Sequence, residues 1–387
     1  PLETPSLEYQ EILTGKYGEE IDKQLYLFKD NGDRDIGLIF DLTVPLCRVV
    51  AMYPDLPKPF KRYQIQRVWR AEKPQSGRFR EFYQCDVDIV GSAEALADTE
   101  IILIAIETLQ ALGVKDFTIK INNRKILNEF LTGLGIKEKD FGNILRAIDK
   151  RDKIGEKEMR EQLDIDKNLI DRIIEFINIK GSNEEILKKI KKIIGGTKGF
   201  EELEEVVNNL SAGGVEEKYF QVDLAMVRGA DYYTGMIFET ILNSLPKFGS
   251  VMSGGRYDKL ISLFLGKEIP AVGISLGIDR LLAGLTELGL VKEKKSLAEV
   301  LVTIFDQKNI KEYLKIAGEL RKEGIKTELY SQVDDLRKQI KYADKQGIPW
   351  VVIAGEDELG RGEVSIKNMR TGQQQSVKIK QIKNFLK

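Results

Sequence analysis

Hydrophobic and polar residues alternate along two stretches of the chain, residues 61–72 and residues 81–91. A period of two is typical of β-strands that have one apolar and one polar face. The charged segment KPQSGRFR between the two stretches predicts the loop of a long hairpin. Because half-buried antiparallel strands usually turn their apolar side chains inward, one set of residues is expected in the core. This set is Ile65, Trp69, Tyr83, Val87 and Ile89.

The opposite faces of the same two stretches are polar. The first carries Gln66, Arg70 and Glu72, and the second carries Phe82, Gln84, Asp86 and Asp88. If the two faces coincide, they form either a solvated surface or the floor of a binding site. Arg78 and Arg80 in the loop would join Arg70 in a guanidinium cluster, which is suited to bidentate binding of triphosphate oxygens. Phe82 would then supply an aromatic face for a base.

Helical patterns occupy the middle of the chain. Residues 98–113 have the length of a helix that ends at Gly113, and residues 116–122 predict the strand that follows. In residues 149–215, apolar positions recur three and four residues apart, which predicts charged amphipathic helices. We interpret this region as a helical insertion domain between the two parts of one core.

The domains predicted on either side of this insertion follow from strand patterns and a polar linker. They are a first part of the core at residues 1–148, a second part at 216–290, a linker at 291–297 and a C-terminal domain at 298–387. The residue pattern of the C-terminal domain predicts the order strand, helix, strand, helix and strand. A hairpin around Thr371 and Gly372 and a short terminal helix are expected to follow. It holds 17 Lys and Arg against 13 Asp and Glu, an excess that suits nucleic acid and an ordinary solvated surface equally well.

Composition excludes several classes of protein and chemistry. A chain of 387 residues with 42% hydrophobic and 31% charged residues is typical of a globular protein with two or three domains, and no apolar run reaches the ~20 residues that span a bilayer. We expect no signal peptide, and because the chain begins at Pro1 we expect a longer native sequence upstream. Cys47 and Cys85 cannot form a disulfide framework, which fits a reducing cytosol.

The chain contains no histidine, which removes Ser/His and Cys/His nucleophiles and imidazole metal sites. Neither of the common glycine-rich phosphate-binding motifs occurs. Chemistry would therefore depend on arginines, carboxylates, tyrosines and backbone groups. One further arginine, Arg280, falls in the first turn of a predicted helix, and that end of a helix favours anions.

Four segments together resemble the class II aminoacyl-tRNA synthetases of the histidyl type. They are FREFYQCDVDIVG, MVRGADYYTG, GGRYDKL and AVGISLGIDRL. The resemblance covers almost the whole chain and implies an α+β fold: a class II antiparallel-sheet catalytic core with a helical insertion, and a C-terminal α/β anticodon-binding domain. It also implies an enzyme that activates L-histidine with ATP and Mg²⁺ and transfers the histidine to the 3′ end of tRNA-His. A cytoplasmic homodimer is expected.

The resemblance further implies roles for particular residues. Arg228 would approach the α-phosphate and the histidine carboxylate, a role that other members of the class give to a metal, and no protein-bound metal is expected. The residues implied at ATP are Arg70 and Arg280 at the phosphates, Arg78 at the γ-phosphate, Glu72 toward the adenine, and Phe82. The residues implied at histidine are Asp88 and Tyr233 at the ring nitrogens, Asp41, Thr43 and Gln84 at the α-ammonium, and Tyr257 in the pocket wall. Tyr232 is expected in the core.

Two features depart from the family pattern, and two other functions remain as alternatives. The chain begins inside the family's first motif, and Ile39 stands where the family usually carries an arginine. The first alternative is a catalytically silent relative that senses histidine and regulates a partner, although such relatives lack the C-terminal domain. The second is a synthetase for another amino acid, which the segments DYYTG and GGRYD oppose. The absence of histidine is compatible with synthesis of the enzyme when charged tRNA-His is scarce, with chance, or with engineering of the sequence.

Overall fold

The computed structural model describes residues 1–16, 22–74, 77–227, 232–291 and 294–386. The chain divides into two compact units, Pro1–Val291 and Lys292–Lys387, and each is described by itself. Among the described residues, no helix is both long enough and apolar enough to cross a membrane. The mixture of helices with largely antiparallel sheets confirms the α+β fold expected from the sequence.

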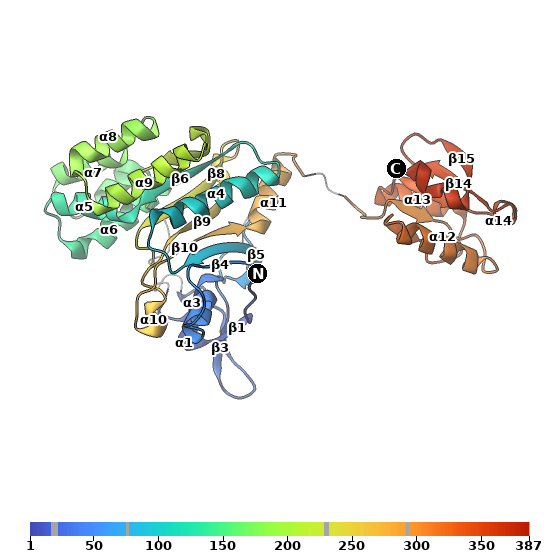
Figure 1. Ribbon diagram of the computed structural model, residues 1–387, viewed down its shortest axis with the longest axis horizontal. Coiled ribbons are helices and arrows are strands. Elements are labelled where there is room, and N and C mark those ends of the chain that lie inside the picture. Colours follow the sequence, from blue (N-terminus) through green and yellow to red (C-terminus); the bar gives the residue numbers. More distant parts are fainter. Residues whose placement is uncertain (17–21, 75–76, 228–231, 292–293, 387) are drawn as a thin grey trace. The chain divides into compact units, whose positions relative to one another are not determined.

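A seven-stranded sheet organises the first unit (Figure 1). Its strands, in spatial order, are β4 (Phe60–Trp69), β5 (Glu81–Val90), β10 (Ala271–Gly277), β9 (Ser250–Arg256), β8 (Met236–Leu242), β6 (Phe117–Asn123) and β7 (Phe220–Val222). All neighbours pair antiparallel except β6 and β7. Strands β5, β10 and β9 are neighbours in this sheet, although β5 lies before the helical region of the sequence and β9 and β10 lie after it.

The hairpin of β4 and β5 buries its polar face, which reverses the burial expected from the sequence. Arg62 pairs with Asp88 in the register, and Gln64 pairs with Asp86, so the two polar faces coincide. These four residues are each less than 5% exposed, whereas Ile65 is 56% exposed. The expectation that Ile65 and Tyr83 lie in the core is therefore wrong, while that for Ile89 is confirmed and Trp69 and Val87 are half-buried.

The reversal follows from what covers each face. Helix α3 (Thr43–Met52) and the short α10 (Ser262–Leu265) lie on the polar side of the hairpin (Figure 1). The N-terminal segment also crosses this side, where Thr4 bonds to the side chains of Gln64 and Gln66. Helices α4 (Ala95–Ala111) and α11 (Ile278–Glu287) pack on the other side, over β5, β9 and β10, and leave the outer face of β4 exposed.

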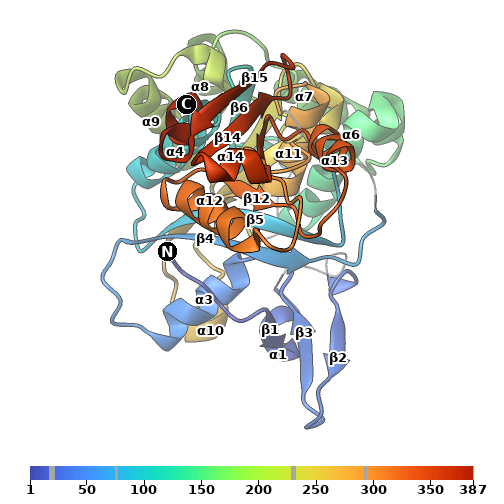
Figure 2. The same cartoon turned by 90° about the vertical axis from the view of Figure 1, so that its right-hand side faces the viewer.

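A smaller sheet extends the first unit at its N-terminal end. It consists of β1 (Leu7–Tyr9), β3 (Asp35–Leu38) and β2 (Leu27–Lys29), with the short helix α1 (Gln10–Leu13) after β1. The β2–β3 hairpin points away from the seven-stranded sheet (Figure 2).

The helices between β6 and β7 share one core with the sheet. They are α5 (Arg124–Gly133), α6 (Glu138–Glu161), α7 (Lys167–Ile177), α8 (Asn183–Ile194) and α9 (Lys198–Ala212). Ile173 and Phe176 of α7 belong to the same buried cluster as Ile119 and Ile121 of β6. The predicted insertion boundary at residue 149 lies inside α6, whose helical backbone is interrupted at Gly155 instead.

The second unit contains a five-stranded sheet in the order β12, β11, β13, β14, β15. In chain order its elements are β11 (Val300–Val302), α12 (Ile310–Lys322), β12 (Thr327–Leu329), α13 (Leu336–Gln346), β13 (Trp350–Ile353), α14 (Glu356–Gly360), β14 (Glu363–Asn368), β15 (Gln374–Lys378) and α15 (Ile382–Leu386). The strand and helix order matches the prediction, with the hairpin turn at Gly372 in the left-handed region, but the short α14 was not expected.

One buried glutamine ties helix α13 to the segment that follows strand β11. Gln339 is fully buried, and its amide accepts from Ile304 N at 2.9 Å and donates to Ile304 O at 2.7 Å. The same amide nitrogen donates to Asp334 O at 2.8 Å. We expect Gln339→Ala to lower the free energy of unfolding of this unit by about 2 to 4 kcal/mol, because it leaves buried backbone groups without partners.

The chain has two tryptophans, Trp69 in the first unit and Trp350 in the second. Urea unfolding followed by fluorescence in a Trp69→Phe background therefore reports on the second unit alone. Lys341→Ala, an exposed position on the same helix, serves as the control and should change this free energy by less than about 0.5 kcal/mol. Equal effects of the two substitutions would contradict the role given to Gln339.

Candidate active site

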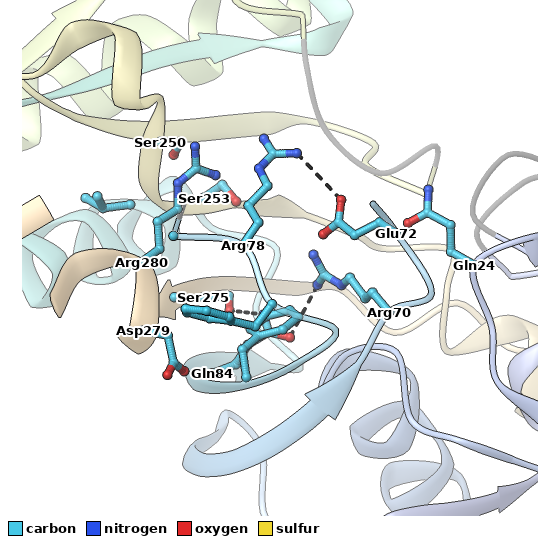
Figure 3. A pocket seen from close by; sticks show the side chains of 15 residues that line it. Gln24, Arg70, Glu72, Arg78, Gln84, Ser250, Ser253, Ser275, Asp279 and Arg280 are labelled. Atoms are coloured by element: carbon cyan, nitrogen blue, oxygen red, sulfur yellow. Dashed lines mark hydrogen bonds and ion pairs between the residues drawn. The ribbon is translucent and has the colours of Figure 1, made fainter. Parts of the chain in front are cut away.

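A cavity of about 220 Å³ opens on the polar side of the hairpin (Figure 3). The loop between β4 and β5, strands β5, β9 and β10, and the start of α11 all contribute to its wall. Its lining is Gln24, Arg70, Glu72, Gly77, Arg78, Phe79, Phe82, Gln84, Ser250, Val251, Ser253, Ser275, Gly277, Asp279 and Arg280. Five of the residues expected at ATP, and Gln84 from the set expected at histidine, therefore line one cavity.

Arg70 lies between two aromatic rings at the centre of this wall. Its guanidinium carbon is 4.3 Å from the centre of the Phe40 ring and 4.9 Å from that of Phe82. Its Nε donates to Phe40 O at 3.2 Å and its Nη2 donates to Gln84 Oε1 at 3.3 Å. These contacts hold a flexible side chain in one orientation, so that its remaining N–H groups can face an anion.

Arg78 and Arg280 approach the cavity from the hairpin loop and from α11 (Figure 3). Arg78 pairs with Glu72 at 3.6 Å, and Arg280 donates to the backbone carbonyl of Phe248. Burial, and then the positive charge of Arg78, lower the pKa of Arg280. Two guanidinium groups that repel one another in a concave site form a place where a polyanion is stabilised.

In the cavity wall, Gln84 donates to the hydroxyl of Ser275 (Figure 3). Further along β5, the same face of the strand carries buried charged groups. Asp88 is 3% exposed; it accepts from the hydroxyl of Tyr257 and pairs with Arg62 at 2.8 Å. Burial raises the pKa of Asp88, while Arg62 and the Tyr257 hydroxyl act in the opposite direction. Arg62 was given no role in the sequence analysis, and only the cross-strand register places it opposite Asp88.

Asp86 lies between Gln84 and Asp88 on the same face of β5 and has a free oxygen. It is 2% exposed, its Oδ2 is 4.0 Å from Arg62, and its Oδ1 has no hydrogen-bond partner among the described atoms. Burial raises the pKa of Asp86 to about 7, although the charge of Arg62 opposes the shift. Asp86 can therefore change its charge near neutral pH, which makes it a site residue that the sequence analysis placed on the polar face but gave no role.

The loop before α3 supplies a third buried carboxylate, that of Asp41. Asp41 Oδ1 accepts from the backbone N–H groups of Thr43 and Val44, both at 3.1 Å, at the start of the helix. The hydroxyl of Tyr232 lies 3.5 Å from Asp41 Oδ2, and its ring packs edge to face against Tyr233 at 5.1 Å. Tyr232 is therefore more than the core residue expected from the sequence, because its hydroxyl reaches the polar site.

Two glycines allow the backbone strands to approach these side chains. A Cβ on Gly273 of β10 would collide with the carboxylate of Asp88, and a Cβ on Gly254 of β9 would collide with the backbone carbonyl of Gly273. The AVGISLG and GGRYDKL segments therefore need these glycines for close packing. Sequence alone indicates the glycines but not the side chain that one of them accommodates.

Arg256 anchors the segment that carries Tyr257. It is 4% exposed, pairs with Asp98 of α4, and donates to the carbonyl of Ser92 at 2.9 Å. Asp258, two residues on, accepts from the Thr234 hydroxyl at 3.1 Å, which joins this segment to the one that carries Tyr233. Arg256 and Asp98 are thus supporting residues that the sequence analysis missed.

The remaining predictions differ in how far the structure describes them. The residues that line the cavity do not include Asp41, Thr43, Asp88, Tyr233 and Tyr257. Arg228, expected at the α-phosphate, lies outside the described residues. Among the described residues, no group of three or more Cys, Asp and Glu is placed to hold a metal ion.

The raised pKa of Asp86 predicts a pH-dependent stability. The carboxyl ionises more readily in the unfolded chain, so the parent protein loses stability as the pH rises from about 4 to about 7. Asp86→Asn removes this loss. We therefore expect the difference in unfolding free energy to shift in favour of the variant by about 2 kcal/mol between about pH 5.5 and pH 8. Urea unfolding in a Trp350→Phe background, where Trp69 reports on this unit, measures the shift, and a difference that stays constant with pH would contradict it.

Comparisons with known proteins agree with this geometry. The family model described as histidyl-tRNA synthetase matches residues 1–281, and that described as anticodon binding domain matches residues 299–387. The histidine–tRNA ligase of Clostridium tetani is 44% identical over 398 aligned positions, which cover 100% of this chain and 90% of the relative. That of Rhodopirellula baltica is also 44% identical, over 97% of this chain and 87% of the relative.

A solved structure gives the same result. The crystal structure of histidyl-tRNA synthetase from Nostoc sp. PCC 7120 superimposes with a TM-score of 0.86 and 35% identity, covering 100% of this chain and 91% of that one. The resemblance expected from four short segments is thereby confirmed over the full length. The chain belongs to the histidyl-tRNA synthetase family.

Proposed function

We propose that this chain is a histidine–tRNA ligase that forms histidyl-adenylate from L-histidine and ATP and then transfers the histidine to the 3′ end of tRNA-His. The observation that carries the proposal is the convergence of Arg70, Arg78 and Arg280 on one cavity whose inner end meets buried carboxylates. A polyanion and a small cationic or hydrogen-bonding group are accommodated side by side in such a site.

In the nucleotide half of the site, Arg70 and Arg280 contact the ATP phosphates, and Arg78 contacts the γ-phosphate. Phe82 stacks on the adenine and Glu72 faces its polar edge. The contacts of Arg70 with Phe40, Phe82 and Gln84 support this assignment, because they orient the guanidinium before ATP binds. A donor held in place in this way stabilises charge that develops at the transferred group.

In the amino-acid half, Asp88 and Tyr233 bond the two ring nitrogens of histidine, and Tyr257 forms the wall behind them. Asp41, Thr43 and Gln84 bind the α-ammonium group. The burial of Asp88 and Asp41 supports this assignment, since a site whose buried polar groups need two ring nitrogens rejects apolar amino acids by leaving those groups unpaired.

The reaction needs positioning and charge stabilisation rather than a covalent enzyme intermediate. The histidine carboxylate attacks the α-phosphorus, pyrophosphate leaves, and the tRNA hydroxyl then takes the acyl group. Arg228 neutralises the α-phosphate. Mg²⁺ would be bound together with ATP and would neutralise charge on the phosphate oxygens.

The ligase is favoured over the silent regulatory protein. The curated relatives bear the name histidine–tRNA ligase, and residues 299–387 match an anticodon-binding domain, which a histidine sensor does not need. We place the enzyme in the cytoplasm, where its tRNA substrate is found and where the free Cys47 and Cys85 stay reduced.

Exchange of labelled pyrophosphate into ATP tests the first half-reaction. We expect exchange that depends on histidine and on no other amino acid. Arg70→Gln and Arg228→Ala should each lower its rate by about 100-fold, or about 3 kcal/mol, because each removes a cation that stabilises the reacting phosphates. Arg34→Gln, at an exposed arginine paired with Asp30 in the β2–β3 hairpin, is the control and should leave the rate within about twofold. Pyrophosphate exchange that depends on another amino acid, or the absence of amino-acid-dependent exchange, would contradict the proposal.

A homodimer accounts for the exposed apolar face of the edge strand. Tyr63, Ile65 and Tyr83, which we call the outer patch, are 50%, 56% and 39% exposed on adjacent strands. Large apolar side chains on an edge strand invite pairing with another chain, and most identical partners associate about a two-fold axis.

Sedimentation measures this association. The parent chain should sediment near twice its mass of 43.9 kDa, and Ile65→Glu should shift it toward the monomer by placing a charge in the interface. Leu263→Glu, at an equally exposed position (56%) on α10, should leave the mass unchanged. A monomeric parent, or a dimer insensitive to Ile65→Glu, would exclude the outer patch as the interface.

A further inference from the structure

A buried arginine lies behind the proposed histidine site and takes no part in the assignments above. Arg62 projects from the polar face of β4, and its side chain is 1% exposed. Its Nη2 is 2.8 Å from Asp88 Oδ2 and donates to Leu42 O at 3.1 Å, while its Nη1 donates to Gln64 Oε1 at 3.1 Å. A charge of this kind is stable inside a protein only when it is paired and hydrogen-bonded.

These contacts connect the two ends of the amino-acid site. Asp88 is the group proposed for the ring nitrogen, and Leu42 lies between Asp41 and Thr43, which are proposed for the α-ammonium. One rigid guanidinium therefore bonds β5 and the loop before α3 at the same time. The other terminal nitrogen, Nη1, donates to Gln64 Oε1 at the same time, and the planar guanidinium fixes the angle between these contacts, which the single ammonium of a lysine does not.

Arg62 also balances the charge of its surroundings. Asp88 and Asp86 on β5 and Asp41 before α3 are buried carboxylates, and Arg62 is the cation that faces the first two. The other titratable groups near them are Cys47 of α3, Tyr232, Tyr233 and Tyr257. Burial raises the pKa of each of these four, so they stay neutral. The charge of Asp88 therefore depends on Arg62.

The charge of Asp88 matters for recognition of a ring N–H. An ionised carboxylate is only an acceptor, whereas the protonated form carries a donor hydrogen and accepts more weakly. Burial raises the pKa of Asp88 and Arg62 opposes this shift. Removing Arg62 therefore moves the pKa of Asp88 further upward, and a larger fraction of the group is protonated at neutral pH.

We propose that Arg62 is a positioning residue for substrate selection: it holds Asp88 as an ionised, oriented acceptor for one ring N–H of histidine and ties it to the Asp41 loop. This inference rests on the proposed function, and it gives a specificity role to a residue that does not touch the substrate. ATP binding, which depends on the outer part of the cavity, does not depend on Arg62.

The test is the KM for histidine and for ATP in pyrophosphate exchange, measured between about pH 6.5 and pH 8.5. We expect Arg62→Gln to raise the histidine KM by about 10- to 100-fold near pH 7 and to change the ATP KM by less than about twofold. The ratio of variant to parent histidine KM should fall as the pH rises, because the Asp88 carboxyl then ionises even in the absence of the Arg62 charge. Titration of the substrate histidine affects the KM of variant and parent equally, so it does not change this ratio.

Two further variants separate charge from geometry. Arg62→Lys keeps the charge but not the planar pair of terminal nitrogens that contact Asp88, Leu42 and Gln64, so its histidine KM should rise at every pH by a constant, smaller factor. Lys61→Gln, the neighbouring cation that faces outward and pairs with Glu100 at 2.6 Å, is the matched control and should leave both KM values unchanged.

A double variant covers the case in which Arg62→Gln does not fold. Removing both charges, in Arg62→Gln with Asp88→Asn, avoids a buried unpaired carboxylate. If Arg62 acts mainly through Asp88, the double variant should exceed Asp88→Asn alone in histidine KM by no more than the small factor expected for Arg62→Lys, which reflects the lost contact with Leu42. A further tenfold loss in the double variant, a pH-independent ratio for Arg62→Gln, or an equal rise in the ATP KM would overturn the inference. A parent chain that shows no histidine-dependent exchange would instead overturn the proposed function.

Discussion

The site depends on one constraint, the burial of the polar face of the β4–β5 hairpin. Removing charged and amide side chains from water is costly unless each finds a partner. Arg62 pairs with Asp88 and Gln64 bonds to Gln66, while Thr4 of the N-terminal segment completes this row. The partners leave little freedom for any of these side chains. A rigid and desolvated set of donors and acceptors is what recognition of a small polar molecule requires.

The same constraint acts on other strands and helices that pack around the hairpin, where it requires glycines at two positions and a buried ion pair at a third. Strand β10 must approach Asp88 closely, and only Gly273 leaves room for the carboxylate. Strand β9 must approach β10, and Gly254 meets that need. Arg256 and Asp98 then fix the end of β9 against α4, which sets the position of Tyr257. These supporting residues thus position the polar side chains of the site by packing and ion pairing.

Charge divides the site into two regions. The outer region is cationic, with Arg70, Arg78 and Arg280 around the cavity. The inner region is acidic, because it holds the buried carboxylates of Asp41, Asp86 and Asp88, and among the described residues Arg62 pairs with the last two. A substrate that is negative at one end and able to donate hydrogen bonds at the other is aligned by this gradient. The unpaired oxygen of Asp86 lies at the inner end of the gradient, next to the residues proposed for the amino acid.

The sequence by itself determined much of this protein. Alternation predicted both strands of the hairpin, helical spacing predicted the helices, and the order of elements in the second unit followed from local pattern, because these signals depend on near neighbours in the chain. Four short segments indicated the family. Only the tertiary structure decided which face of the hairpin is buried, since the N-terminal segment and α10, which help to cover it, are remote from it in sequence. The partnership of Arg62 with Asp88 likewise depends on the register between two strands, and a local pattern carries no information about such a register.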